Sequence, residues 1–68
     1  MDEKIRELTG IAAAVAGHCQ KCFIYHYSEA KKFKIEQKDI EEVIEFAKAI
    51  RSAGNKGMDE FVKNTVSQ

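Results

Sequence analysis

Apolar residues recur along this chain at steps of three and four positions, which is the period of an α-helix. The chain contains no proline, and no segment alternates apolar and polar residues for long enough to predict a strand. The sequence therefore predicts an all-α fold of about four helices. No repeat, low-complexity tract or linker divides the chain, so residues 1–68 are expected to form a single domain.

Three helices are expected before the first strong break in the pattern. The first covers about residues 2–16, and Gly17 is expected to end it in the left-handed conformation. The second runs from residue 18 or 19 to residue 33. The expected core faces are Ile5, Leu8, Ile11, Ala12 and Val15 in the first helix and Ile40, Val43, Ile44, Ala47 and Ile50 in the third.

The segment Gly54-Asn55-Lys56-Gly57 is the strongest helix breaker in the chain. A short last helix is expected after it, with an apolar inner side formed by Met58, Phe61, Val62 and Thr65 or Val66. The side chains of Tyr25 and Tyr27 are expected to pack in the core or in an interface. The phenylalanines expected in the core are Phe23, Phe33, Phe46 and Phe61.

A chain of 68 residues can build only a marginal hydrophobic core. A bridge between Cys19 and Cys22 would close too short a loop to staple distant parts of the fold. The second helix is apolar on more than one side, which suggests burial by a partner subunit. The sequence therefore predicts a homo-oligomer.

The charge balance and the apolar runs exclude several classes of partner. Eleven basic and eleven acidic residues give a net charge of zero, so the basic excess of a nucleic-acid binder is missing. The longest apolar run, residues 11–16, is far shorter than a membrane span of about 20 residues. The acidic N-terminus lacks the layout of a signal peptide, so a cytoplasmic location is expected. In that compartment cysteines rest as thiols unless they are catalytic, sensing or metal-bound.

Two cysteines, Cys19 and Cys22, form a CxxC motif where the second helix is expected to start. A cysteine in the first helical turn has a lowered pKa, because unpaired backbone N–H groups and the helix dipole stabilise the thiolate. Two intervening residues also bring the sulfurs close enough for a disulfide. His26 follows Cys22 by four residues, so its imidazole can face that sulfur as a base or proton shuttle.

Other uses of the same residues remain open at this stage. Haem attachment is excluded because Phe23 follows the second cysteine, and a thioredoxin-type site needs strands that the sequence lacks. A structural zinc site needs four ligands, and His18 points away from the stripe that carries Cys22 and His26. A metal shared between subunits and a non-catalytic helical module are the alternatives to redox chemistry.

One family matches this spacing closely. Its motif consists of a glutamate, eleven residues, CxxC, three residues and a histidine. In this chain the motif residues are Glu7, Cys19, Cys22 and His26. With its Ala-rich helix end at residues 11–16, the sequence resembles the alkylhydroperoxidase D-like (AhpD-like) branch of the carboxymuconolactone decarboxylase family. The likeness extends from about residue 3 to residue 62. Without it, Glu7 would be interpreted as an ordinary solvated residue.

The resemblance implies an oligomeric, all-helical thiol oxidoreductase that reduces organic hydroperoxides as an antioxidant peroxidase. Cys22 would attack the peroxide and become a sulfenic acid, which Cys19 would capture as a disulfide. Glu7 and His26 would form a proton relay through a bound water. A dithiol or protein reductant would regenerate the thiols, and no cofactor is expected.

The sequence also departs from the pattern of this family. Peroxidase members often have a second histidine where this chain has Lys21, and Lys34 stands where relatives commonly have a helix-ending glycine. Lys21 can still stabilise a thiolate electrostatically. Lactone decarboxylation is not expected, because the decarboxylase members do not depend on the cysteine pair.

Overall fold

The structure, a computed structural model, describes residues 1–54 and 56–67. It contains the helices α1 (Glu3–Ala16), α2 (Gln20–Lys32), α3 (Gln37–Ala53) and α4 (Met58–Val66). No strand occurs in the described ranges, so the prediction of an all-α fold is confirmed. The first two helices begin and end within about two residues of their predicted bounds.

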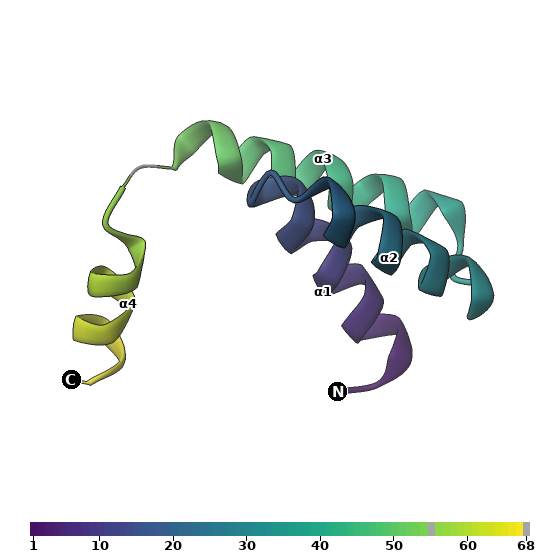
Figure 1. Ribbon diagram of the computed structural model, residues 1–68, viewed down its shortest axis with the longest axis horizontal. Coiled ribbons are helices and arrows are strands. Elements are labelled where there is room, and N and C mark those ends of the chain that lie inside the picture. Colours follow the sequence, from purple (N-terminus) through teal and green to yellow (C-terminus); the bar gives the residue numbers. More distant parts are fainter. Residues whose placement is uncertain (55, 68) are drawn as a thin grey trace.

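Helix α1 is the central element, because both α2 and α3 pack against it (Figure 1). Ile11 of α1, Ala30 of α2 and Ile40 of α3 are fully buried where the three helices meet. Ile35, between α2 and α3, completes this buried cluster. The partly buried side chains around it are Leu8, Phe23, Tyr27, Val43 and Ile44. Ile11 and Ile40 are the largest fully buried side chains among the described residues, so the core is small.

The turn between α1 and α2 is sharp and differs from the sequence prediction. Gly17 has an ordinary φ of −91°, whereas His18 has the left-handed φ of 58°. The N–H of His18 donates to the carbonyl of Val15 at 3.4 Å, and the N–H of Cys19 donates to that of Ala14 at 2.9 Å. These two bonds define a Schellman motif, in which the residue after the C-cap is left-handed. The reversal therefore falls one residue later than predicted.

Helix α2 ends in the same way. Lys34 has a φ of 58°, its N–H donates to the carbonyl of Lys31 at 3.1 Å, and Ile35 donates to Ala30 at 3.0 Å. The sequence prediction that Lys34 occupies a position suited to glycine is confirmed. The motif also directs Ile35 into the core beside Ala30, which is the hydrophobic contact that commonly accompanies this helix end.

Several apolar side chains predicted to be buried are exposed. Ile5 and Ile50 are about half exposed, and so is Phe33. Phe46 is 65% exposed. On α3, Ile40 and Ala47 occupy the face against α1, and none of the described helices covers the side that carries Phe46 and Ile50. The apolar pattern of α3 is therefore wider than the face that one chain can bury. Tyr25 is exposed as well, whereas Tyr27 packs on the core as predicted.

Helix α4 stands apart from the other helices in Figure 1 and contacts none of them in the described parts of the chain. Its predicted inner residues, Met58, Phe61, Val62, Thr65 and Val66, are all exposed, so this prediction is wrong for the single chain. Before this helix, Gly54 is extended and Gly57 is left-handed at φ 86°. Asn55, in the predicted breaker, lies outside the described residues.

In the described residues, every helix is too short or too polar to cross a bilayer.

Candidate functional site

The turn at His18 places Cys19 at the start of α2. Cys19 is the N-cap of this helix, with φ −105° and ψ 94°, and its Sγ accepts the N–H of Cys22 at 3.1 Å. Cys22 lies in the first helical turn. The sequence prediction that the pair sits at a helix start therefore agrees with the structure. A sulfur at the N-cap faces N–H groups that have no partner within the helix, where negative charge is stabilised.

Cys19 and Cys22 are joined by a disulfide, with their Cα atoms 5.2 Å apart. The two residues differ in accessibility, because Cys22 is exposed and Cys19 is half-buried. Cys22 is therefore the more accessible residue of the pair.

Glu7 and His26 join α1 to α2 beside this pair. The Oε1 atom of Glu7 lies 2.7 Å from the Nδ1 atom of His26. Glu7 is only 4% exposed, and the His26 side chain is partly buried. Burial of a carboxyl group is strongly unfavourable unless the group is paired. Glu7 is thus no ordinary solvated residue, and the contact with His26 provides its buried carboxyl group with a hydrogen-bond partner.

The contact between Glu7 and His26 fixes the chemistry of the imidazole ring. An ionised carboxylate only accepts hydrogen bonds, so when Glu7 is ionised, Nδ1 carries the proton and donates to Glu7. In neutral His26 the other nitrogen, Nε2, is then the basic one. A carboxylate partner of this kind sets the orientation and tautomer of a histidine. The structure therefore holds an oriented base on α2, one helical turn after Cys22.

Gly10 belongs to the same site, although the sequence analysis did not identify it. A Cβ atom built on Gly10 would lie 2.4 Å from Cγ of His26, so the ring lies directly against the backbone of α1. Gly10 follows Glu7 by three residues and shares its face of the helix. A glycine inside an alanine-rich helix destabilises it by about 1 kcal/mol relative to alanine. That unfavourable residue, one turn after Glu7, was the signal of a close approach.

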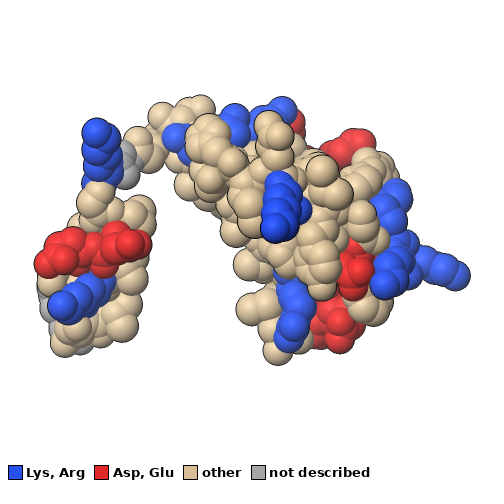
Figure 2. Space-filling model, viewed as in Figure 1, with Lys and Arg blue, Asp and Glu red and all other residues tan. Residues whose placement is uncertain are grey.

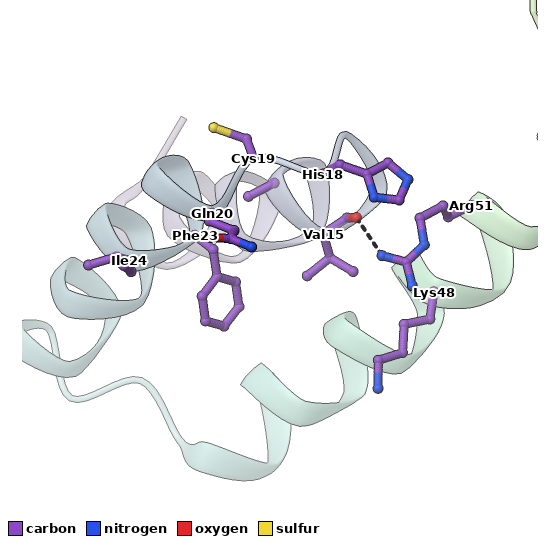
Figure 3. Close-up of a pocket in the computed structure, with 9 residues that line it drawn as sticks. Val15, His18, Cys19, Gln20, Phe23, Ile24, Lys48 and Arg51 are labelled. Atoms are coloured by element: carbon purple, nitrogen blue, oxygen red, sulfur yellow. Dashed lines mark hydrogen bonds between the residues drawn. The ribbon is translucent and has the colours of Figure 1, made fainter.

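A groove of about 520 Å³ lies on another side of Cys19, between the start of α2 and the end of α3. Its lining residues are Ala14, Val15, His18, Cys19, Gln20, Phe23, Ile24, Lys48 and Arg51. Figure 3 shows the sulfur of Cys19 pointing away from Phe23 and Lys48, and Arg51 donating to the carbonyl of Val15 at 3.0 Å. Cys22 does not line this groove. The groove and the exposed sulfur are therefore separate features of the surface.

The two histidines point to different surroundings. His18 lines the groove, whereas His26 pairs with Glu7. Among the residues that the structure describes, no three His, Cys, Asp or Glu side chains come together in a group that could hold a metal ion. The site residues that the structure brings together are thus Cys19 with Cys22, and Glu7 with His26.

Comparison with known proteins places this chain in a family. No curated protein and no solved structure matches the chain significantly. The family model described as "Carboxymuconolactone decarboxylase family" matches residues 1–56, a range that includes α1, α2, α3 and the two pairs of side chains just described. The chain belongs to the carboxymuconolactone decarboxylase family.

Proposed function

We propose that this protein is an AhpD-like thiol oxidoreductase that reduces organic hydroperoxides, cycling Cys19 and Cys22 between dithiol and disulfide. One observation carries the proposal. A histidine oriented by a buried glutamate, with 2.7 Å between Nδ1 and Oε1, lies one helical turn after a cysteine pair that can form a disulfide. An oriented base beside a thiol is the arrangement that generates a thiolate nucleophile.

The oxidative half of the cycle begins with Cys22. Nε2 of His26 accepts the thiol proton, directly or through a water, and Glu7 stabilises the imidazolium that results. The Cys22 thiolate attacks the terminal peroxide oxygen, the O–O bond breaks, and the alkoxide that leaves takes the proton from His26. Cys22 is now a sulfenic acid. The Cys19 thiol attacks its sulfur, the S–O bond breaks, and water leaves as the disulfide forms.

The reductive half begins from the disulfide seen in the structure. A thiolate of a dithiol or protein reductant attacks the exposed sulfur of Cys22, and Cys19 leaves as a thiolate. The leaving sulfur already accepts the N–H of Cys22 at the N-cap, so its negative charge is stabilised. A second reductant thiol then releases Cys22. In a reducing cytoplasm the pair would rest as thiols and form the disulfide only during turnover.

Steady-state consumption of an alkyl hydroperoxide with excess dithiol tests this function. Cys22→Ser is expected to abolish turnover, because it removes the attacking sulfur. Cys19→Ser is the matched control: reduced first and then assayed without dithiol, it should still consume about one equivalent of peroxide, leaving a sulfenic acid at Cys22 that a dimedone-type reagent labels. Turnover by Cys22→Ser at the wild-type rate would contradict the proposal.

A further inference from the structure

Helix α4 has an apolar face that no other part of the described chain covers. Met58, Phe61, Val62 and Val66 are all exposed, with Phe61 at 66%. The helix has nine residues, and helices this short are only marginally stable in water without tertiary contacts. Another surface is therefore needed to stabilise α4.

The groove beside Cys19 is a surface of complementary character. Its floor is apolar, formed by Ala14, Val15 and Phe23, and Ile24 stands exposed at its side. Two cationic side chains of α3, Lys48 and Arg51, form its basic edge. Lys48 also pairs with the exposed Glu45 at 3.0 Å, and Arg51 donates to the carbonyl of Val15. The sulfur of Cys19 points away from Phe23 and Lys48 in Figure 3, and Cys22 does not line the groove. The groove therefore suits docking better than reaction with a bound substrate.

The charges of α4 match this basic edge. Asp59 and Glu60 lie in the first turn of α4, and Figure 2 shows acidic side chains gathered in one band across this helix. Asp59 precedes Val62 by three residues, so it borders the apolar face, whereas Glu60 lies on the opposite side of the helix. An acidic residue beside an apolar stripe would meet Lys48 or Arg51 when the stripe enters the groove. Such charge pairs fix orientation and specificity more than affinity.

We propose that α4 of a second copy of this chain packs in the groove beside Cys19, and that the two copies exchange α4 reciprocally. Figure 1 shows α4 directed away from its own three-helix unit, as is typical of an arm that is exchanged between protomers. The reciprocal exchange is self-complementary and closes as a dimer. The partner's α4 then covers the Cys19 side of the site and leaves Cys22 open.

Sedimentation equilibrium of the full chain tests the exchange. The wild type is expected at twice the 7.7 kDa mass of one chain. Val62→Asp places a charge in the apolar face, and we expect it to weaken the dimer at least about tenfold. Asn64→Asp adds the same charge on the other side of α4 and should leave the dimer intact. Both variants lie on a helix without contacts to the core of its own chain, so circular dichroism should show α1–α3 still folded.

A second pair of variants tests the charge match. Asp59→Lys is expected to weaken the dimer, whereas Glu60→Lys, with an identical change of charge, is expected to have little effect. Equal effects of these two variants would contradict the proposed orientation of α4 in the groove.

Cross-linking identifies the chain that supplies the groove. With benzoylphenylalanine in place of Phe61, irradiation should link residue 61 to peptides containing Phe23 or Lys48, in a product of twice the chain mass. A link to these residues within one chain, a link elsewhere, or a monomeric wild type would overturn the proposal. None of these measurements involves peroxide, so the exchange and the proposed thiol chemistry can fail independently.

Discussion

The imidazole ring of His26 lies against the backbone of Gly10, and in this position its Nδ1 atom is 2.7 Å from Oε1 of Glu7. The two contacts come from one face of α1, since Gly10 follows Glu7 by three residues. The absence of a side chain at Gly10 is thus what lets α2 approach closely enough for a buried carboxylate to orient the histidine.

Gly10→Ala tests this relationship, because the close approach decides whether the substitution raises or lowers the free energy of unfolding. At an ordinary helix position the change stabilises a protein by about 1 kcal/mol. Here the new Cβ would lie 2.4 Å from the His26 ring, so the ring or α2 must move and the hydrogen bond to Glu7 must lengthen. We therefore expect a lower free energy of unfolding in urea and a changed NMR signal of the His26 ring. Thr9→Ala, at an exposed neighbouring position, should stabilise the protein slightly. A gain near 1 kcal/mol in Gly10→Ala would show that the ring is not constrained there.

Glu7→Gln separates the charge of Glu7 from its hydrogen bond. The amide oxygen can still accept from Nδ1 of His26, so the fold should be retained. The neutral amide stabilises the imidazolium less, and peroxide turnover is expected to fall about 10–100-fold. Glu7→Ala leaves Nδ1 unpaired and should in addition lower the free energy of unfolding by about 1–3 kcal/mol. Glu3→Gln, on the exposed first turn of α1, is the control and should change neither quantity. Full turnover in Glu7→Gln would exclude a role for the carboxylate charge.

The local features of this fold could be predicted from the sequence, because they depend on neighbouring residues. The helical period located α1 and α2 to within about two residues, and it placed Cys19 and Cys22 at the start of α2. The pairing of Glu7 with His26 followed from resemblance alone, since the two residues are 19 positions apart and no local rule joins them. The resemblance implied a water in this relay, whereas the two side chains are in direct contact at 2.7 Å.

The remaining errors have two physical causes. Near the end of α1, the left-handed conformation was predicted at Gly17, because glycine adopts it most easily. The Schellman hydrogen bonds instead require it at the next residue, His18. Phe46 and Phe61 belong to apolar patterns with helical spacing, and both are exposed in the single chain. Such a pattern predicts that a surface covers these side chains, but it does not say whether that surface belongs to the same chain or to another one. Periodicity therefore identified the apolar faces correctly while overstating what one chain buries.

The end of α2 provides a test of stability away from the site. Lys34 holds a left-handed φ of 58°, a conformation that destabilises a residue with a Cβ atom by about 1 kcal/mol. Lys34→Gly should raise the free energy of unfolding by about 0.5–1 kcal/mol, the gain being reduced by the greater freedom of glycine in the unfolded chain. Lys34→Ala removes the same side chain but keeps the Cβ, so it should not stabilise. If both variants gain equally, loss of the lysine charge rather than backbone conformation is responsible.

The N-cap position of Cys19 has a consequence for the reduced protein. Its Sγ accepts the N–H of Cys22 at 3.1 Å, so in Cys22→Ser the remaining thiol should ionise with a pKa below that of an ordinary cysteine. Cys22, in the first turn of the helix and beside Lys21, should also ionise early in Cys19→Ser. Thiolate absorbance titrated in both variants measures the two values separately. If His26 contributes at Cys22, His26→Ala should raise the pKa in the Cys19→Ser background and leave that of Cys19 nearly unchanged. Two ordinary pKa values would remove the thiolate that the proposed peroxide chemistry requires.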